Sequence, residues 1–174
     1  LGGPAIAVAV AVMLVFVVEM RQFQEPGIGT QRAALSILAV CYAGLHDVVM
    51  SIWAGDIDRI RSTNDEMRAL ANDYDMALWK LYVNIHDAIV GCMADEPGAP
   101  DELESSLFEY KAQGCWLWIT LYLAEKAKAL LRSGDIEAAE ATISRSFSEV
   151  TATGESWAEP ELHRIRGEIF LAQN

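Results

Sequence analysis

The feature that most constrains this chain is a recurrence of similar residues every 40 positions. The recurrence is seen in a column of tyrosines, at Tyr42, Tyr82 and Tyr122. A His-Asp dipeptide repeats with the same spacing, at 46–47 and 86–87. A unit of about 40 residues can hold two antiparallel helices, and tandem helical hairpins stack into an α-solenoid. The sequence therefore predicts an all-α stack of helical hairpins.

Helical periodicity continues through almost the whole chain after Thr30, and short segments rich in Gly, Pro, Asp and Asn interrupt it. We predict helices at residues 31–54, 56–72, 75–94, 99–113, 115–133, 135–152 and 157–173. We expect a repeat domain at 31–174, preceded by an apolar helix and a Pro/Gly linker at 1–30. The repeats are placed at 31–74, 75–114 and 115–154, with a half repeat at 155–174. The predicted fold is a right-handed α-solenoid of about three hairpins plus a half repeat.

The tripeptide Gly-Asp-Ile opens the second helix of two units, at 55–57 and 134–136. The glycine and aspartate stand where a helix cap or a short turn is expected. In the later unit, the small Ala139 allows the two helices of the hairpin to approach closely. This pattern is close to that of tetratricopeptide repeats. The earlier unit is a degenerate version, because Ile60 replaces the small residue and Asn64 interrupts the buried stripe.

The charge balance is acidic, with 13 Lys and Arg against 25 Asp and Glu and a formal net charge of −12. Direct nucleic-acid binding is not expected, since phosphate contacts need clustered basic residues. An acidic surface serves solubility, or it docks a basic partner. Cys41, Cys92 and Cys115 are scattered in apolar segments, which indicates reduced, buried thiols in a cytoplasmic protein.

The N-terminal segment Leu1–Val18 contains no charged residue, and residues 5–18 are apolar throughout. A helix that spans a bilayer needs about 20 apolar residues, and a core helix needs fewer. We expect a buried repeat helix here, with a membrane-spanning segment and a leader remnant as the alternatives. Because residue 1 is leucine rather than methionine, we expect the chain to be a piece of a longer protein.

No residue pattern in the sequence indicates catalysis. The two His-Asp dipeptides have the residue types of a divalent-metal site, but they occupy equivalent positions of successive repeats, and the only other histidine is His163. We interpret the two dipeptides as equivalent positions that recur because the repeat unit recurs. Neither a phosphate-binding loop nor a nucleophile–base motif is visible. We therefore expect a non-catalytic protein without a cofactor or metal.

Aromatic residues recur in the first helices of successive units, and two interpretations are open. Their rings fill the space between stacked hairpins, or they line a concave groove that takes a peptide or a partner helix. The candidate groove contacts are Trp79, Tyr82, His86, Trp116, Trp118 and Tyr122.

The closing helix presents one apolar stripe, centred on Leu162, Ile165 and Ile169. We expect one side of this stripe to pack on the preceding helix and the other side to remain open. The open edge is then a self-association surface or the cut face of a longer array. These three residues are therefore the candidate terminal-helix interface.

The chain ends in a Thr-Gly-Glu-x-Trp segment that leads into Glu-Leu-His-Arg-x-Arg-Gly-Glu. Its positions are Thr153, Gly154, Glu155, Trp157, Glu161, Leu162, His163, Arg164, Arg166, Gly167 and Glu168. Together with the Gly-Asp turn and Ala-rich helix at 134–150, this segment resembles the C-terminal tetratricopeptide region of large bacterial signalling proteins. Residues 55–82 resemble an earlier repeat of the same arrays.

In proteins of that family, a class III cyclase or winged-helix domain and an AAA-type ATPase module precede the helical array. The resemblance implies a regulatory or protein-interaction array, with ATP and cyclic-nucleotide chemistry in upstream domains. Its partner would be a protein, a peptide or another domain of the parent chain. The alternatives are a structural or oligomerisation spacer, and an array tethered to a membrane through residues 1–18.

Overall fold

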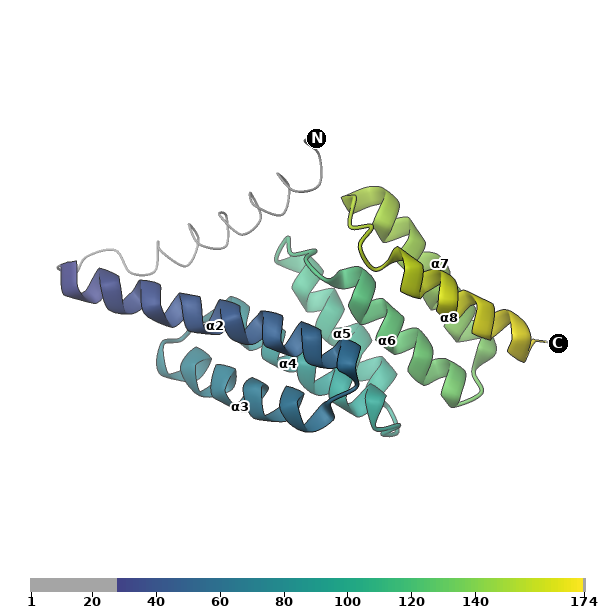
Figure 1. Ribbon diagram of the computed structural model, residues 1–174, viewed down its shortest axis with the longest axis horizontal. Coiled ribbons are helices and arrows are strands. Elements are labelled where there is room, and N and C mark those ends of the chain that lie inside the picture. Colours follow the sequence, from purple (N-terminus) through teal and green to yellow (C-terminus); the bar gives the residue numbers. More distant parts are fainter. Residues whose placement is uncertain (1–27, 174) are drawn as a thin grey trace. The chain divides into compact units, whose positions relative to one another are not determined.

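The computed structural model describes residues 28–173, with side chains from Leu35 onward. Within this range the chain forms seven α-helices and no strand, so the predicted all-α class is confirmed. The helices are α2 (Ile28–Ala54), α3 (Ile57–Asp73), α4 (Ala77–Met93), α5 (Ala99–Ala112), α6 (Ile119–Arg132), α7 (Ile136–Thr153) and α8 (Glu159–Ala172), as labelled in Figure 1. The apolar segment Leu1–Val18 lies outside the described residues.

All seven predicted helices are present, and only the starts of α2 and α6 differ by more than two residues. α2 begins at Ile28, inside the predicted linker, because one glycine in a helix costs only about 1 kcal/mol and does not stop it. α6 begins at Ile119 rather than at Cys115. The reason is Trp118, whose φ of 67° lies in the left-handed region and cannot continue a right-handed helix.

The chain divides into two compact units, Leu1–His86 and Asp87–Asn174, and the division falls inside α4. Unit 1 therefore contains α2, α3 and the first half of α4. Unit 2 contains the rest of α4 and α5 to α8. The predicted repeat boundaries at 74/75, 114/115 and 154/155 stay predictions.

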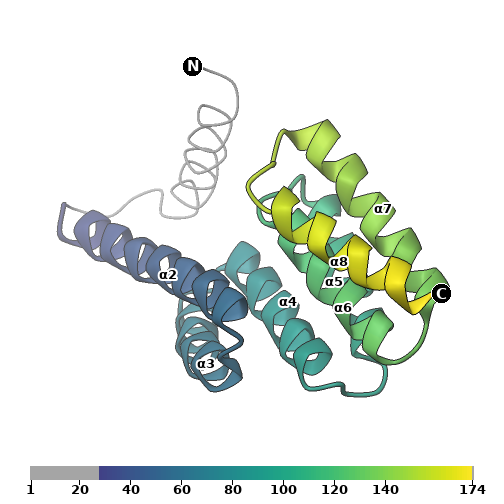
Figure 2. The same ribbon diagram turned by 45° about the vertical axis from the view of Figure 1, so that its right-hand side comes forward.

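The two Gly-Asp-Ile segments form turns with helix caps, as predicted. Gly55 and Gly134 are left-handed, with φ of 71° and 84°. Asp56 and Asp135 each accept a hydrogen bond from the backbone N–H three residues further on, at 3.0 and 3.1 Å. Each turn thus ends one helix and caps the next, which joins α2 to α3 and α6 to α7 as antiparallel pairs (Figure 2).

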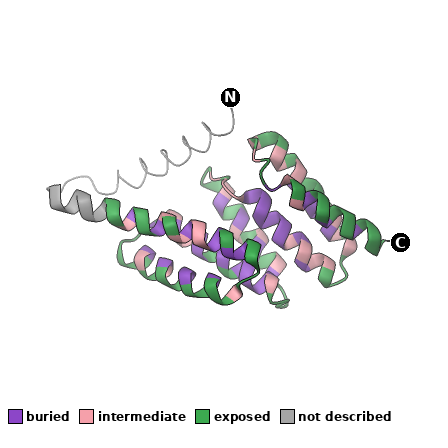
Figure 3. Ribbon diagram, in the orientation of Figure 1, coloured by how far each residue is buried: buried purple, intermediate pink, exposed green. Residues whose placement is uncertain are grey.

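The core of unit 2 is centred on α6, whose residues 119–125 are all buried (Figure 3). Helices α7 and α8 both pack against it. Ala139 of α7 is fully buried, which confirms the predicted close approach of α6 and α7. The buried cluster consists of Ala124, Ala127, Ala139, Ile143, Leu162, Ile165 and Ile169.

Helices of unit 2 are also joined by ion pairs between residues about one repeat apart in the sequence. Two of the pairs join α5 to α7, and the third joins the turn after α4 to the end of α6. They are Asp95–Arg132 at 2.7 Å, Glu104–Arg145 at 2.7 Å and Lys111–Glu149 at 2.5 Å. Their sequence separations are 37, 41 and 38 residues, close to the 40-residue recurrence of the sequence.

Candidate functional site

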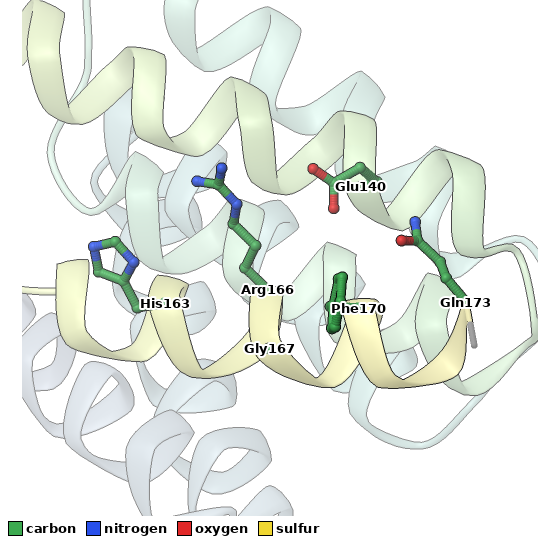
Figure 4. A pocket seen from close by; sticks show the side chains of 6 residues that line it. All are labelled: Glu140, His163, Arg166, Gly167, Phe170 and Gln173. Atoms are coloured by element: carbon green, nitrogen blue, oxygen red, sulfur yellow. The ribbon is translucent and has the colours of Figure 1, made fainter.

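A surface groove of about 590 Å³ lies between α7 and α8. Its lining residues are Glu140, His163, Arg166, Gly167, Phe170 and Gln173. In Figure 4, Glu140 of α7 and Arg166 of α8 project from their helices into the space between them. Residues 163, 166, 167 and 170 share one face of α8, because they follow helical spacing.

The guanidinium group of Arg166 lies over an aromatic ring. Its guanidinium carbon lies 5.1 Å from the centre of the Phe147 ring, within the range of a cation–π interaction. The ring of His163 contacts the same phenylalanine, with 4.8 Å between ring centres. The half-buried Phe147 thus holds two basic side chains of α8 beside the groove.

Arg166 differs from the other arginines and lysines of unit 2. Lys111, Lys126 and Arg145, for example, each form an ion pair with a glutamate. Within the described part of the chain, no carboxylate lies within ion-pair distance of Arg166. Glu140 lines the same groove and accepts a hydrogen bond from Ser144 at 3.3 Å. The groove therefore combines a cation that is available for pairing with an apolar wall at Phe170.

The predicted terminal-helix interface residues lie on a different face of α8. Leu162, Ile165 and Ile169 are completely buried in the core of unit 2. A partner could reach them only by displacing this packing. The large exposed apolar side chains of α8 are Phe170 and Leu171, with 63% and 75% of their surface accessible.

The predicted groove aromatics are divided by the structure into a buried and a partly exposed set. The buried set consists of Trp79, Tyr82, His86 and Tyr122, each at most 3% exposed. Their burial agrees with the packing interpretation. Trp116 is 49% exposed, and Trp118 is half-buried against Trp157 at 4.9 Å between ring centres.

His86 belongs to a buried polar network of unit 1. Its ring nitrogen Nδ1 lies 3.1 Å from the side-chain oxygen of Asn64, whose amide nitrogen donates to the backbone oxygen of Val83 at 3.0 Å. Burial lowers the pKa of His86 from 6.5 to about 3, so this imidazole is neutral at physiological pH. Asn64 interrupts the apolar stripe of α3 in the sequence. Its polar side chain is needed there because it contacts the buried ring of His86, 22 residues away.

The two His-Asp dipeptides differ in their contacts. His46 contacts the backbone oxygen of Tyr42 at 2.9 Å. Asp47 accepts hydrogen bonds from Arg59 at 2.8 Å and Thr63 at 2.6 Å, and these bonds lower its pKa. Over the residues that the structure describes, no group of three or more His, Cys, Asp or Glu side chains could hold a metal ion.

A smaller groove of about 250 Å³ lies between α3 and the first half of α4 in unit 1. Its charged lining residues already have partners. Lys80 pairs with Asp75 at 2.6 Å, and Arg68 lies 3.7 Å from Asp65. The α7–α8 groove is therefore the better candidate for a binding site.

One stretch of α2, Leu35–Ala54, is long and apolar enough to span a membrane by length and composition, in the part of the chain covered by the structure. Core helices of folded domains meet the same criterion. Within the stretch, Leu45, Val48 and Ile52 are buried in unit 1.

Glu155 has a structural role that the sequence did not reveal. Its carboxylate accepts hydrogen bonds from the backbone N–H of Trp118 at 2.7 Å, and from both the N–H and the hydroxyl of Thr120, at 3.2 and 2.8 Å. Glu155 thus caps α6 from the loop that follows α7. The only sequence signal was the place of Glu155 in the Thr-Gly-Glu motif.

Comparison with known proteins adds no assignment: no protein-family model, no curated protein and no solved structure matches this chain.

Proposed function

We propose that the chain is a non-catalytic helical-repeat array that binds a protein partner, built as a right-handed solenoid of tetratricopeptide-like hairpins. The observation that carries the proposal is the set of ion pairs between residues 37–41 positions apart in unit 2. In a stack of equal units, equivalent residues of neighbours lie side by side, so contacts occur at one repeat length. The agreement with the 40-residue recurrence supports a stack of repeats.

The resemblance of the closing segment supports a regulatory place for this array in a cytoplasmic signalling protein of bacteria. Catalytic domains of the parent protein would then hold the ATP or cyclic-nucleotide chemistry. Nucleotide hydrolysis or cyclisation by the pure chain would contradict a non-catalytic role. The assay would compare the chain with a heat-unfolded sample of the same preparation, in the presence of magnesium and either ATP or GTP.

The α7–α8 groove is the proposed site for the partner. Arg166 can pair with a carboxylate, and Phe170 offers an apolar contact beside it. Gly167 lies between them without a side chain, and a Cβ atom built there meets no atom within 4 Å. An amphipathic helix with one acidic residue matches this combination, since helices dock by apolar side chains at helical spacing.

A selection from a library of helical peptides tests the site. We expect peptides that bind the wild-type chain to contain an acidic residue within an apolar stripe. Phe170→Ala and Arg166→Gln should each weaken binding about tenfold, as for a contact worth roughly 1.4 kcal/mol. Phe108→Ala is the matched control, because Phe108 is an exposed phenylalanine of α5 outside the groove. Selected peptides that bind all three variants equally, or a selection that yields no binder, would contradict the site.

A further inference from the structure

A second surface of unit 2 is formed by two loops, residues 113–118 between α5 and α6 and residues 154–158 between α7 and α8. Glu155 joins them through its three hydrogen bonds to Trp118 and Thr120. The Glu155 backbone N–H in turn donates to the hydroxyl of Thr153 at 3.1 Å, and that hydroxyl donates to the backbone oxygen of Glu149 at 2.8 Å. The loops are therefore held in one arrangement by side chains of the protein itself.

Three of the five tryptophans of the chain are in these two loops. Trp118 and Trp157 meet edge to face, with an interplanar angle of 81°. Trp157 remains 39% exposed and Trp116 49% exposed. Large aromatic side chains that a fixed loop keeps in contact with water are characteristic of interaction surfaces, because indoles contribute much contact area at little entropic cost. We call Trp116, Trp118 and Trp157 the tryptophan edge.

The charges around the tryptophan edge indicate the kind of partner. Neither loop contains lysine or arginine. Glu155 and Glu159 lie on either side of Trp157 in the sequence, and the first turn of α8 is acidic. The chain as a whole carries a net charge of −12. The faces of indole rings attract cations, and acidic neighbours strengthen the attraction.

We propose that the tryptophan edge binds an arginine- or lysine-bearing segment of a partner chain, with Trp116 and Trp157 stacked against its cationic side chains. A membrane surface fits less well. Tryptophans do sit at membrane interfaces, but acidic neighbours are repelled by anionic lipids. The proposal is independent of the α7–α8 groove, because none of the three tryptophans lines that groove. The groove is expected to bind an amphipathic helix with one acidic residue.

Calorimetric titration with an acetylated and amidated Gly-Arg repeat peptide tests the proposal. Trp116→Ala should weaken binding by about 2- to 5-fold and the Trp116→Ala/Trp157→Ala double variant by about tenfold, from roughly 0.5–1 kcal/mol per cation–π contact. Neither variant changes the net charge, so the affinity would stay at the wild-type value if the peptide were bound by charge alone. Equal affinities of the variants and wild type would overturn the proposal. Phe170→Ala, in the groove, should have no effect and separates the two sites.

Circular dichroism melts of each variant show whether the fold is retained. If Trp157→Ala unfolds the chain through loss of its Trp118 contact, Trp116→Ala alone decides the outcome, since Trp116 is half exposed. Co-sedimentation with neutral phosphatidylcholine vesicles tests the membrane alternative. The proposal would also be overturned if the wild-type chain bound these vesicles but not the peptide, and the Trp116→Ala variant bound neither.

Discussion

Glu155 caps α6 through Thr120, whose backbone N–H and hydroxyl both donate to the same carboxylate oxygen, at 3.2 and 2.8 Å. The residue at the N-cap position of α6 is Trp118, which has no side-chain oxygen to accept these bonds. Glu155, 35 residues after Thr120, supplies the acceptor instead. The closing motif therefore connects the α7–α8 loop to the start of the central helix of unit 2.

Glu155→Ala is expected to lower the free energy of unfolding by about 1–2 kcal/mol, because two backbone N–H groups of α6 lose a charged acceptor. Urea unfolding followed by circular dichroism measures the change. Glu109→Ala removes an exposed glutamate of α5 and is the control for the loss of one negative charge. Equal stability of the two variants would show that the cap does not stabilise unit 2.

The buried His86 should make the stability of the chain depend on pH. Its pKa is about 3 in the folded state and 6.5 for a free histidine, so the unfolded chain binds the proton first. The stabilisation from neutral His86 is therefore complete above pH 6.5 and is lost as the pH falls toward 3. We expect up to about 1.4 kcal/mol of lost stability per pH unit in this window.

Urea unfolding of wild type and of His86→Gln is measured at several pH values between 3 and 6.5. The difference between the two proteins separates the contribution of His86 to stability from that of the carboxylates. The variant should show the shallower pH dependence. His163→Gln removes an exposed imidazole and is the matched control. An NMR titration of the wild-type His86 ring is a second measurement that needs no variant. A midpoint near 6.5 there would contradict the predicted burial of a neutral ring.

Two helical glycines should respond oppositely to replacement by alanine. At Gly167 a Cβ atom meets nothing within 4 Å, so Gly167→Ala should raise the free energy of unfolding by about 0.5–1 kcal/mol through helix propensity. At Gly91 a Cβ atom would lie 2.9 Å from the Cβ of Ala99. Gly91→Ala should therefore destabilise, by about 1–3 kcal/mol for an overpacked site. Thermal melts of the two variants check the signs, and a common sign would refute the assigned packing of α4 on α5.

Glu104 joins three helices, since it pairs with Arg145 of α7 through two hydrogen bonds of 2.7 and 2.8 Å and with Lys126 of α6 at 2.5 Å. Its bonds to Arg145 are the main reason that its pKa falls to about 2. The side chains of Glu104 and Arg145 are about 40% exposed, so the pair is partly screened by solvent. A double-mutant cycle with Glu104→Gln and Arg145→Gln should give a coupling energy of about 0.5–1 kcal/mol.

The pH dependence of this pair has a defined direction. A carboxyl whose pKa is lowered on folding stabilises the fold above its unfolded value of 4.5, and this stabilisation is lost as the pH falls toward 2. The coupling energy from the cycle should therefore be smaller at the acidic end of this window than at neutral pH. A coupling energy that does not change across this window would show that it does not arise from the ionised form of Glu104.

The sequence by itself determined the helices and their turns. Period-3.6 apolar spacing and the two Gly-Asp-Ile turns are local signals, because a helix is built from hydrogen bonds four residues apart and a cap acts within one turn. For the same reason Ala139 could be assigned to a close helix contact from its place in a tetratricopeptide-like hairpin. The predicted start of α6 was wrong because Trp118 is left-handed and interrupts the helix. The acceptor that caps this start is Glu155, which is close in space but distant in sequence.

The tertiary structure alone decided which side chains remain at the surface. Trp79 and Trp116 look alike in the sequence, yet one is 1% and the other 49% exposed. Leu162, Ile165 and Ile169 were predicted to border an open edge, but all three are completely buried in a cluster with residues of α6 and α7. The groove lies on the adjacent face of α8, which carries Arg166 and Phe170. Exposure depends on which helices meet, and that is set by packing between segments that lie far apart in the chain.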